Sequence, residues 1–555
     1  MSSIEKQAER RAIMRIDAAI KTADAVTASK EILTAWRSSP KSTNVLTLAV
    51  YGLAEMGCRS EAIDLLADAM RALPPTETLL SLMAKIALDL ELLDLAKRTL
   101  EHAINLNPSL PDHYFSYAQC LHQMGDSEEA IGLLQSVLPQ FPTNPDLWNL
   151  VGVITLQFRN NVPSARAFFS EAIRYDDKHP QAWANLAETY SNMPEGLEYY
   201  ERALALDPQN ADLQLGCAMI LLRNGKLQRA WSLYEARLSD RRGTRKSLTY
   251  SHKIKRWRGE NLQKKTLLVT AEQGLGDEVL FAIFFNRLAE KVGRIVIGCD
   301  PRLINIYKRS FPKAYVVGFE DTVRLGERTR SFPQVENCTK GDRLPRIDRA
   351  IPIGSLPSIF WPNLRDLSSF SGGYLLADSV RVSKFGAKLA ARGQRPCVGV
   401  SWRSGNLSEG RKHGYMDLAM VKAVAAIPGI QLVNLQYDAE EAELEEIVRV
   451  AGERFVAFPD IDLKKDLEAN LAIMANLDLV IGPSTATQAL AMAQGVETWC
   501  VHRGVPWWVF NLGNDVKMPF APNYRFIYIN YAKNYRIASE QKVVGELEKW
   551  LSDRG

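Results

Sequence analysis

The sequence is poor in cysteine, and its cysteines show no paired spacing. Seven are spread over 555 residues and none follows a Cys-x-x-Cys pattern: Cys58, Cys120, Cys217, Cys299, Cys338, Cys397 and Cys500. An odd and scattered set of this kind argues against a disulfide framework and against a structural zinc site. We therefore expect a chain that folds without disulfides and without a bound metal.

Long apolar runs are also missing. No stretch of about 18 apolar residues occurs, so the sequence predicts no membrane span. Charged residues are spread through the first twenty positions, among them Glu5, Arg10, Arg15 and Asp17. They leave no room for the apolar core of a signal peptide. We expect a cytoplasmic protein.

An excess of charge of one sign is likewise absent. The chain has 68 Lys and Arg against 64 Asp and Glu, a net charge of +4, which gives no argument for a nucleic-acid partner. With 46% hydrophobic and 24% charged residues, the composition is that of a globular protein. A chain of this length exceeds one hydrophobic core and should divide into about three or four units.

A fixed period runs through the first half of the chain. Proline recurs every 34 residues, at Pro40, Pro74, Pro108 and Pro142. A helical pattern precedes each of these positions, and small residues stand where two antiparallel helices would approach, at Ala62, Ala96 and Ala130. Proline ends a helix because it cannot donate the next hydrogen bond. The period predicts a solenoid of paired helices.

These residues resemble tetratricopeptide repeats over roughly residues 29–238, within a superhelical domain predicted for residues 1–238. The repeat near 191–195 is shortened. Such an array implies a concave groove that binds a peptide or protein segment. The alternatives are a spacer or a dimerisation surface. Trp148 and Trp183, which open helices six residues after the repeat boundary, are interpreted as packing residues rather than ligand contacts.

A basic linker is predicted for residues 239–264, which are rich in Lys and Arg. We interpret it as a solvated connector, although binding of a phosphate group is an alternative. Trp257 and Gly259 are predicted to dock the linker on the second domain.

The second half alternates short apolar runs with helical patterns. Strands are expected at residues 266–271, 294–298 and 315–318, then at 397–402, 431–435, 454–457, 478–482 and 498–501. A helix is expected at 279–292. This alternation predicts an α/β fold of two facing lobes, residues 265–380 and 381–555, with ligands beyond the carboxyl ends of the strands.

The loop after the first strand contains Glu272, Gln273, Gly274, Gly276 and Asp277. Its glycines permit a tight turn and close approach of a substrate, and Asp277 is a candidate catalytic group. The alternative is that Asp277 is the N-cap of the following helix. The loop lacks the third glycine of a dinucleotide-binding fingerprint, and no Gly-Lys-Ser/Thr of a phosphate-binding P-loop follows it.

A second candidate loop follows the strand at 478–482. Ser484, Thr485 and Thr487 precede or open a helix, where free backbone N–H groups and the helix dipole form an anion site. Ordinary helix capping by Ser484 or Thr485 is the alternative. The strand at 397–402 ends in Trp402, Arg403 and Ser404, and the loop beyond it holds three further basic residues, Arg411, Lys412 and His413. These groups could neutralise a phosphate.

Residues 257–526 resemble a glycosyltransferase of the GT-B fold, similar to the heptosyltransferase-like domains that follow tetratricopeptide repeats in many bacterial proteins. The resemblance is carried by the motifs around Asp277, at 353–357, 398–402, 477–481 and 518–520, and by 433–437, which include Gln436. It implies that Asp277 is the acceptor-side base. It also places Trp402, Arg403, Ser404, Lys412, Gln436, Ser484, Thr485 and Thr487 at the nucleotide sugar. The family has Asp where this chain has Ser484 and His where it has Ala489, which argues against an ADP-heptose donor.

The combination of repeats and transferase motifs resembles the bacterial flagellin glycosyltransferases, which move a nonulosonic acid from a CMP donor to Ser or Thr of flagellin. The resemblance implies a protein O-glycosyltransferase with no metal or resident cofactor, a nucleotide sugar as co-substrate, and flagellin as the acceptor bound by the repeats. Two alternatives remain: a non-catalytic adaptor with a decayed transferase half, and a glycosyltransferase of lipid-linked carbohydrate.

Overall fold

The structure is a computed structural model. It describes residues 3–20, 25–56, 58–159, 161–190, 193–239, 248–324, 327–337, 344–369, 372–393, 395–405, 414–503, 517–518, 520–529 and 536–554. The chain forms two compact units. The first contains Met1–Pro208 with the short segments Gly243–Thr249 and Thr322–Thr329, and the second contains Gln209–Arg242, Tyr250–Asp321 and Arg330–Gly555.

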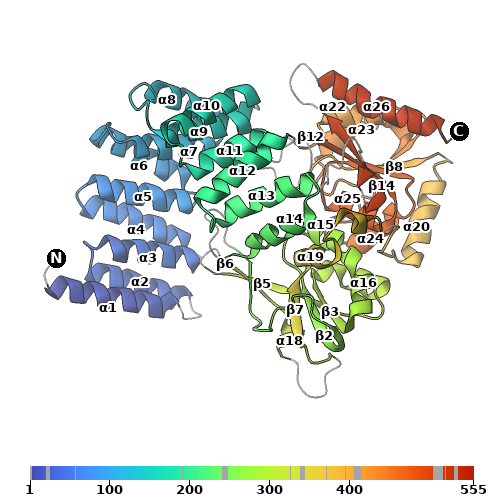
Figure 1. The fold of residues 1–555 in the computed structure, drawn as a ribbon, viewed down its shortest axis with the longest axis horizontal. Helices are drawn as coiled ribbons and strands as arrows, with labels where there is room; N and C mark the ends of the chain where they lie inside the picture. The colour runs from blue at the N-terminus through green and yellow to red at the C-terminus, as the bar shows by residue number, and fades with distance from the viewer. Residues whose placement is uncertain are drawn as a thin grey trace. The chain divides into compact units, whose positions relative to one another are not determined.

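The first unit consists of antiparallel helix pairs (Figure 1). Its helices are α1 (Ser3–Ile20), α2 (Ala25–Ser38), α3 (Thr43–Glu55), α4 (Arg59–Ala72), α5 (Glu77–Asp89), α6 (Leu93–Leu106), α7 (Pro111–Met124), α8 (Ser127–Val137), α9 (Pro145–Ile154), the π-helical turn η1 (Thr155–Arg159), α10 (Val162–Tyr175), α11 (Pro180–Thr189) and α12 (Pro194–Leu206). The predicted paired-helix solenoid is therefore confirmed.

The residues that carry the repeat pattern have the packing roles expected of them. Ala62, Ala96 and Ala130 are fully buried. The ring of Trp148 packs on Phe168, and its indole N–H donates to the Pro142 carbonyl at 2.8 Å. Trp183 repeats this arrangement with Tyr199 and the Asp177 carbonyl. The aromatic residues thus tie each helix to the turn before it, as predicted.

The last helix pair belongs to the second unit. It consists of α13 (Ala211–Arg223), α14 (Leu227–Tyr234) and the 3-10 turn η2 (Glu235–Leu238). The structure thus divides the chain about thirty residues before the predicted domain boundary at residue 238. The reason is physical: α14 packs on α19 (Pro357–Phe360), and the Trp231 indole N–H donates to the Trp361 carbonyl at 2.9 Å.

The first α/β lobe, here the N-lobe, contains a parallel four-stranded sheet in the order β4-β3-β2-β7. Its strands are β2 (Leu262–Thr270), β3 (Val292–Cys299), β4 (Tyr315–Gly318) and β7 (Arg349–Pro352). The first three agree with the prediction, whereas β7 was not predicted. Trp257 is 1% exposed and its backbone N–H donates to the Ala350 carbonyl, so the predicted docking of the linker is confirmed for Trp257, whereas Gly259 is exposed.

The other N-lobe elements are α15 (Leu275–Phe281), η3 (Ala282–Phe284), α16 (Phe285–Lys291), η4 (Pro301–Leu303), α17 (Ile304–Ser310), α18 (Pro333–Glu336), η5 (Ile353–Ser355), α19 and η6 (Leu364–Ser369). A small separate sheet has the order β1-β6-β5, with β1 (Leu248–Tyr250), β5 (Glu320–Arg324) and β6 (Glu327–Ser331). The prediction of one helix over 279–292 is wrong. α15 begins at Leu275, because Gly274 adopts the extended N-cap conformation, and the 3-10 turn η3 interrupts the helix.

The second lobe, here the C-lobe, contains a seven-stranded sheet in the order β10-β9-β8-β11-β12-β14-β13. Its strands are β8 (Cys397–Val400), β9 (Gln431–Asn434), β10 (Phe455–Val456), β11 (Leu479–Gly482), β12 (Glu497–Arg503), β13 (Lys517–Met518) and β14 (Ala521–Ile529). The short strand β13 is antiparallel to β14, and the other pairs are parallel. The five strands predicted for this lobe are confirmed, and β13 and β14 were not predicted.

Helices cover both faces of the C-lobe sheet (Figure 1). They are α20 (Ser379–Ala390), α22 (Leu418–Ala425), α23 (Glu441–Ala451), η7 (Gly452–Arg454), α24 (Leu467–Met474), α25 (Ala486–Gln494) and α26 (Arg536–Ser552). Buried side chains of α22, α23 and α26, such as Val421, Ile447 and Leu547, pack on Val400 and Ile481 of the central strands. Strands covered on both faces explain the continuous apolar runs in the sequence.

Among the described residues, no helix combines the length and the apolarity needed to cross a bilayer. The same residues contain no group of three or more His, Cys, Asp or Glu side chains arranged to hold a metal ion.

Candidate functional site

The C-lobe strand order changes direction between β8 and β11. In open parallel sheets of this kind, ligands bind where two neighbouring loops diverge at the carboxyl ends of the strands. Here these loops are 401–405 after β8 and 483–485 after β11. They start side by side, because the Ser401 N–H donates to the Ile481 carbonyl at 3.1 Å. The predicted donor residues 402–404 and 484–487 therefore follow two adjacent strands at the same edge of the sheet.

α25 begins immediately after the β11 loop. Thr485 occupies its N-cap position but makes no side-chain capping hydrogen bond. The alternative of ordinary capping by Thr485 is therefore wrong. A helix start without a side-chain cap presents backbone N–H groups and the positive end of the helix dipole, which together attract anions.

Gln488 braces this loop and was not predicted. Its carboxamide is fully buried and lies 2.6 Å from the Thr485 hydroxyl and 3.1 Å from the Ser401 hydroxyl. With its NH2 group toward Thr485, the carboxamide also donates to the Pro483 carbonyl and accepts from the Gly482 N–H. A Cβ atom at Gly482 would lie 2.1 Å from this carboxamide, so the position requires glycine. Gln488 thereby joins the ends of β8 and β11 to the start of α25.

Ser484 turns toward the interior of the C-lobe. Its hydroxyl hydrogen-bonds the side chains of Cys500 and Tyr524. Burial raises the pKa of the Cys500 thiol to about 12, so the thiol is a neutral hydrogen-bonding group at physiological pH. Thr487 is 5% exposed. Of the three hydroxyl residues predicted here, Thr485 is the one that occupies the N-cap position of α25.

The residues predicted in and beside the loop after β8 are hydrogen-bonded to one another. The buried Gln436 carboxamide accepts from the N–H groups of Trp402 and Arg403, at 2.8 and 3.0 Å, and donates to the Arg403 carbonyl at 3.1 Å. The Arg403 guanidinium pairs with Glu443 and donates to the Asp438 carbonyl. Gln436 and Arg403 therefore shape the loop, and their side chains are already hydrogen-bonded within the protein.

Ser404 lies further out, with its hydroxyl 2.5 Å from that of Tyr415. The predicted phosphate ligand Lys412, with Arg411 and His413, lies outside the described residues. Their part of the predicted site stays a prediction.

The N-lobe strand order changes direction between β2 and β7, and the last helix pair contacts the loops that follow these two strands. Arg237 of η2 donates two hydrogen bonds to Glu272 Oε1, at 2.9 and 3.1 Å, and one to Oε2 at 3.0 Å. Glu272 Oε1 also accepts from the Gly354 N–H at 2.9 Å, and Arg237 donates to the Ser355 hydroxyl at 2.8 Å. Both charged side chains are 3% exposed. The predicted acceptor-side residue Glu272 is thus saturated by protein groups.

The remaining donors of Arg237 are used as well. They reach the Tyr234 carbonyl at 3.2 Å and the Glu235 carboxylate at 3.1 Å. Burial alone would lower the pKa of Arg237, but the charge of Glu272 raises it above the usual range. The guanidinium also lies 4.4 Å from the centre of the Tyr234 ring. The pair is therefore a fully hydrogen-bonded buried contact.

The next residue of the loop is also held by the last helix pair. The Gln273 amide donates to the Tyr234 hydroxyl at 2.8 Å. Tyr234 is 2% exposed, whereas Gln273 is half-buried. Glu272 and Gln273, two consecutive residues, are thus both fixed by the C-terminal end of α14 and by η2.

Asp277 is the third residue of α15 and is half-buried. The N-cap of this helix is Gly274, so the alternative of Asp277 as N-cap is wrong. A Cβ atom at Gly274 would lie 3.8 Å from the Asp277 carboxylate. A carboxylate in the first turn is favourable, because it faces the positive end of the helix dipole.

The starts of α15 and α25 meet. The two helices pack against each other, and a Cβ atom at Gly276 would lie 3.5 Å from the Ala486 Cα and 3.6 Å from its backbone nitrogen. The missing side chain at Gly276 permits this approach. It brings the loop of the N-lobe that carries Asp277 to the helix start of the C-lobe that begins after Thr485.

Glu278, the neighbour of Asp277, is a buried acid that the sequence did not single out. It is 3% exposed, and its carboxyl group accepts from the Asp300 N–H at 3.1 and 3.3 Å. Burial raises its pKa to about 8, although the Asp300 N–H acts in the opposite direction. Glu278 therefore keeps its proton at neutral pH.

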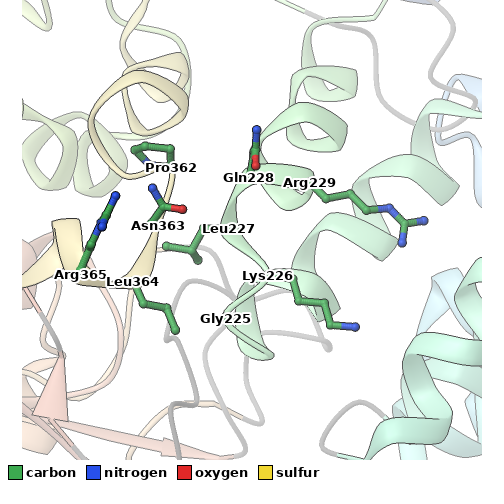
Figure 2. Close-up of a pocket in the computed structure, with 9 residues that line it drawn as sticks. All are labelled: Gly225, Lys226, Leu227, Gln228, Arg229, Pro362, Asn363, Leu364 and Arg365. Atoms are coloured by element: carbon green, nitrogen blue, oxygen red, sulfur yellow. The ribbon is translucent and has the colours of Figure 1, made fainter.

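A groove of about 740 Å³ lies where the turn before α14 faces the segment after α19. It is lined by Gly225, Lys226, Leu227, Gln228, Arg229, Pro362, Asn363, Leu364 and Arg365. Figure 2 shows Leu227 directed toward Asn363, while Lys226 and Arg229 extend away from that segment. The groove is a feature of the last helix pair that the sequence did not predict.

Comparison with known proteins identifies the repeats. Two models of the tetratricopeptide repeat match residues 87–154 and 191–241. The chain is similar to Protein FlbA of Caulobacter vibrioides, with 29% identity over 459 residues that cover 80% of this chain and 74% of that protein. The N-terminal region therefore contains tetratricopeptide repeats, at residues 87–154 and 191–241.

Among solved structures, the chain is similar to a thermophilic tetratricopeptide-repeat protein of Thermus thermophilus. The identity is 22%, the match covers 33% of this chain and all of that one, and the TM-score is 0.28. It is also similar to yeast Tom70, with 20% identity, coverage of 42% of this chain and 51% of that one, and a TM-score of 0.34.

Proposed function

We propose that the protein is a metal-independent glycosyltransferase of the GT-B type that transfers a sugar from a nucleotide donor to Ser or Thr of a protein bound by its repeats. A nonulosonic acid from a CMP donor is the proposed sugar and flagellin the proposed acceptor, both from the resemblance described above. The transferase is proposed to work in the cytoplasm, without a nucleic-acid partner.

The observation that carries this proposal is the approach of Gly276 to Ala486. It brings a carboxylate-bearing loop of one α/β lobe to an anion-attracting helix start of the other. A transferase that joins two substrates needs an acceptor-side base next to the leaving group of the donor. A repeat domain in the same chain supports a protein as the acceptor.

In the proposed mechanism, the start of α25 and the Thr485 hydroxyl bind the donor phosphate. The helix dipole and backbone N–H groups then stabilise the negative charge that develops on the leaving nucleotide. Lys412 is the proposed cationic partner of that phosphate. Trp402, Arg403, Gln436 and Ser484 keep the two C-lobe loops in shape, and Ser404 and Thr487 border the donor.

Asp277 is the proposed general base. It accepts the proton of the acceptor Ser or Thr hydroxyl as the oxygen attacks the sugar carbon and the bond to the nucleotide phosphate breaks. A positioned base of this kind contributes roughly 10²–10⁴ in rate. Gly274, which is exposed and carries no side chain, leaves room for the acceptor beside the loop.

A second candidate function, a non-catalytic adaptor, is favoured by one observation. Arg403 and Ser484 are engaged by Glu443 and by Cys500 and Tyr524, so two of the predicted donor ligands already have protein partners. An adaptor would use the repeats to bind a protein and would need no nucleotide.

Calorimetric titration of the full-length protein with CMP, UDP, ADP and GDP separates the two functions. The transferase proposal predicts saturable binding of one nucleotide, CMP if the donor assignment is right. A folded protein that binds none of the four would leave the adaptor as the better account.

A further inference from the structure

The loop that carries the proposed base is fixed from two sides. On one side, Gly276 packs on Ala486 at the start of α25. On the other side, Glu272 and Gln273 are hydrogen-bonded to Arg237 and Tyr234 of the last helix pair, which is the last repeat of the solenoid. Asp277 follows Gln273 closely in the chain, so the direction of this loop is set at one end by the repeat and at the other by the C-lobe.

The contacts that Arg237 makes with the N-lobe loops are buried and have a defined geometry. Arg237 uses its guanidinium on both carboxylate oxygens of Glu272 and on Ser355, which arrive from the two N-lobe loops that follow β2 and β7. A Cβ atom at Gly354 would lie 2.0 Å from Glu272 Oε1. Side chains larger than glycine at 354 would therefore displace the carboxylate and, with it, the loop.

The Tyr234–Gln273 contact is of a different kind. Gln273 is half-buried and could turn its amide to water, yet it donates to a hydroxyl that is almost fully buried. Loss of the Tyr234 hydroxyl should cost the fold little stability, because water can replace it at the half-buried Gln273 amide. The hydrogen bond does restrict the direction in which the loop runs toward Asp277.

We propose that Tyr234 and Arg237 are positioning residues of the acceptor site, so that the last repeat forms part of the transferase and not only of the acceptor-binding solenoid. This inference rests on the proposed function, in which Asp277 is the base. The repeat holds the 272–277 loop in the orientation that aims Asp277 at the acceptor hydroxyl. Displacement of a catalytic group by about 1 Å costs on the order of 100-fold in rate.

The test uses the full-length protein and the variants Tyr234→Phe, Gln273→Leu and the double variant. Tyr234→Phe removes one hydroxyl and keeps the ring beside Arg237. Tyr200→Phe is the matched control, because its hydroxyl is also buried and bonded, to Glu188 at 2.7 Å, but on the preceding repeat pair. The measurements are kcat and KM for transfer, nucleotide affinity, and hydrogen exchange of residues 271–281 compared with residues 479–494.

We expect Tyr234→Phe and Gln273→Leu each to lower kcat by about tenfold and the double variant to be no worse than either, because one contact is removed in all three. Exchange should rise in residues 271–281 only, and nucleotide affinity and the control should not change. Unchanged kcat and exchange, or faster exchange with unchanged kcat, would overturn the positioning role. A wild-type protein without transfer activity whose Tyr234→Phe variant still loosens this loop would refute the proposed function and leave the positioning contact standing.

Discussion

Arg237 and Glu272, 35 positions apart in the sequence, form a buried ion pair with a closest N–O distance of 2.9 Å. The arginine ends the last repeat and the glutamate begins the loop that leads to Asp277. The last helix pair is therefore joined to the first α/β lobe through a contact in which every donor of the guanidinium has a partner.

Arg237→Met should destabilise the second unit strongly, because it leaves Glu272 buried without its counter-ion. Breaking a buried pair of this kind typically costs about 3–5 kcal/mol. The double variant Arg237→Met with Glu272→Gln should recover part of that loss, since no charge stays buried. Thermal unfolding of the full-length protein measures both.

Arg381 offers a matched control for this experiment. It also donates to both oxygens of a carboxylate, Asp466, at 2.8 and 2.9 Å, but the side chains are 45% and 39% exposed. Arg381→Met should cost at most about 1 kcal/mol. Equal losses of unfolding free energy for Arg237→Met and Arg381→Met would show that burial does not make the Arg237–Glu272 pair more important for stability.

The position of the unit boundary makes a prediction about truncation. A chain that begins at Gln209 retains α13, α14 and η2, so it should fold and bind nucleotide but modify the acceptor protein poorly, because it lacks most of the repeats. A chain that begins at Tyr250 loses Tyr234 and Arg237 and should not fold. Near-ultraviolet circular dichroism and nucleotide titration distinguish them. A folded, fully active chain starting at Tyr250 would show that the last repeat is dispensable.

Thr485→Glu should weaken nucleotide binding at least tenfold, equivalent to about 1.4 kcal/mol, because it places a negative charge where the donor phosphate is proposed to lie. Thr485→Gln is the control: it has the same size and also loses the native contact with Gln488, but it adds no charge. Calorimetry with the preferred nucleotide gives both affinities. If the two variants bind equally well, the donor phosphate lies elsewhere.

Glu278 predicts a specific pH dependence of stability. Its pKa is raised to about 8 in the folded protein from an ordinary value of 4.5. Between these values the unfolded chain releases the proton and the folded protein keeps it, so the free energy of unfolding falls as pH rises, by up to about 1.4 kcal/mol per pH unit. Glu278→Gln removes this dependence, and its advantage over the wild type should grow from pH 6 to pH 8 and then level off.

Several ionisable groups face Glu278 in the folded protein. They are Asp300, Arg302 and Arg330, with Cys299 and Tyr307 on the neighbouring elements. Glu290→Gln, at an exposed position on α16, is the control and should show no change with pH. If the difference in unfolding free energy between Glu278→Gln and the wild type does not change with pH, the Glu278 carboxyl is ionised in the folded state.

Much of the fold could be predicted because its signals are local. Proline every 34 residues marks the repeats, and buried parallel strands produce apolar runs such as 266–271. β7 was not predicted, because it is only four residues long and includes an arginine and a proline. The start of α15 was not predicted, because two nearby glycines are typical of a loop. In the structure, Gly274 is the N-cap of the helix and Gly276 lies against Ala486.

The candidate site was predictable only in part, for a similar reason. The rule that ligands bind beyond the strand ends points to the loops of Asp277 and Thr485. It does not say which polar groups are already satisfied by long-range partners. Gln436, Arg403 and Glu272 have the residue types of ligands, yet their partners come from segments far along the chain.

The most direct test of the proposed transferase is the intact mass of the acceptor protein after incubation with full-length enzyme and a nucleotide sugar, CMP-linked nonulosonic acid first. The wild type should add the mass of one or more sugar residues. Asp277→Asn should slow this transfer by roughly 100-fold or more, because Asn cannot accept the proton. Its melting temperature and nucleotide affinity should stay near those of the wild type. An acceptor whose mass never changes, or an Asp277→Asn variant that transfers at the wild-type rate, would contradict the account.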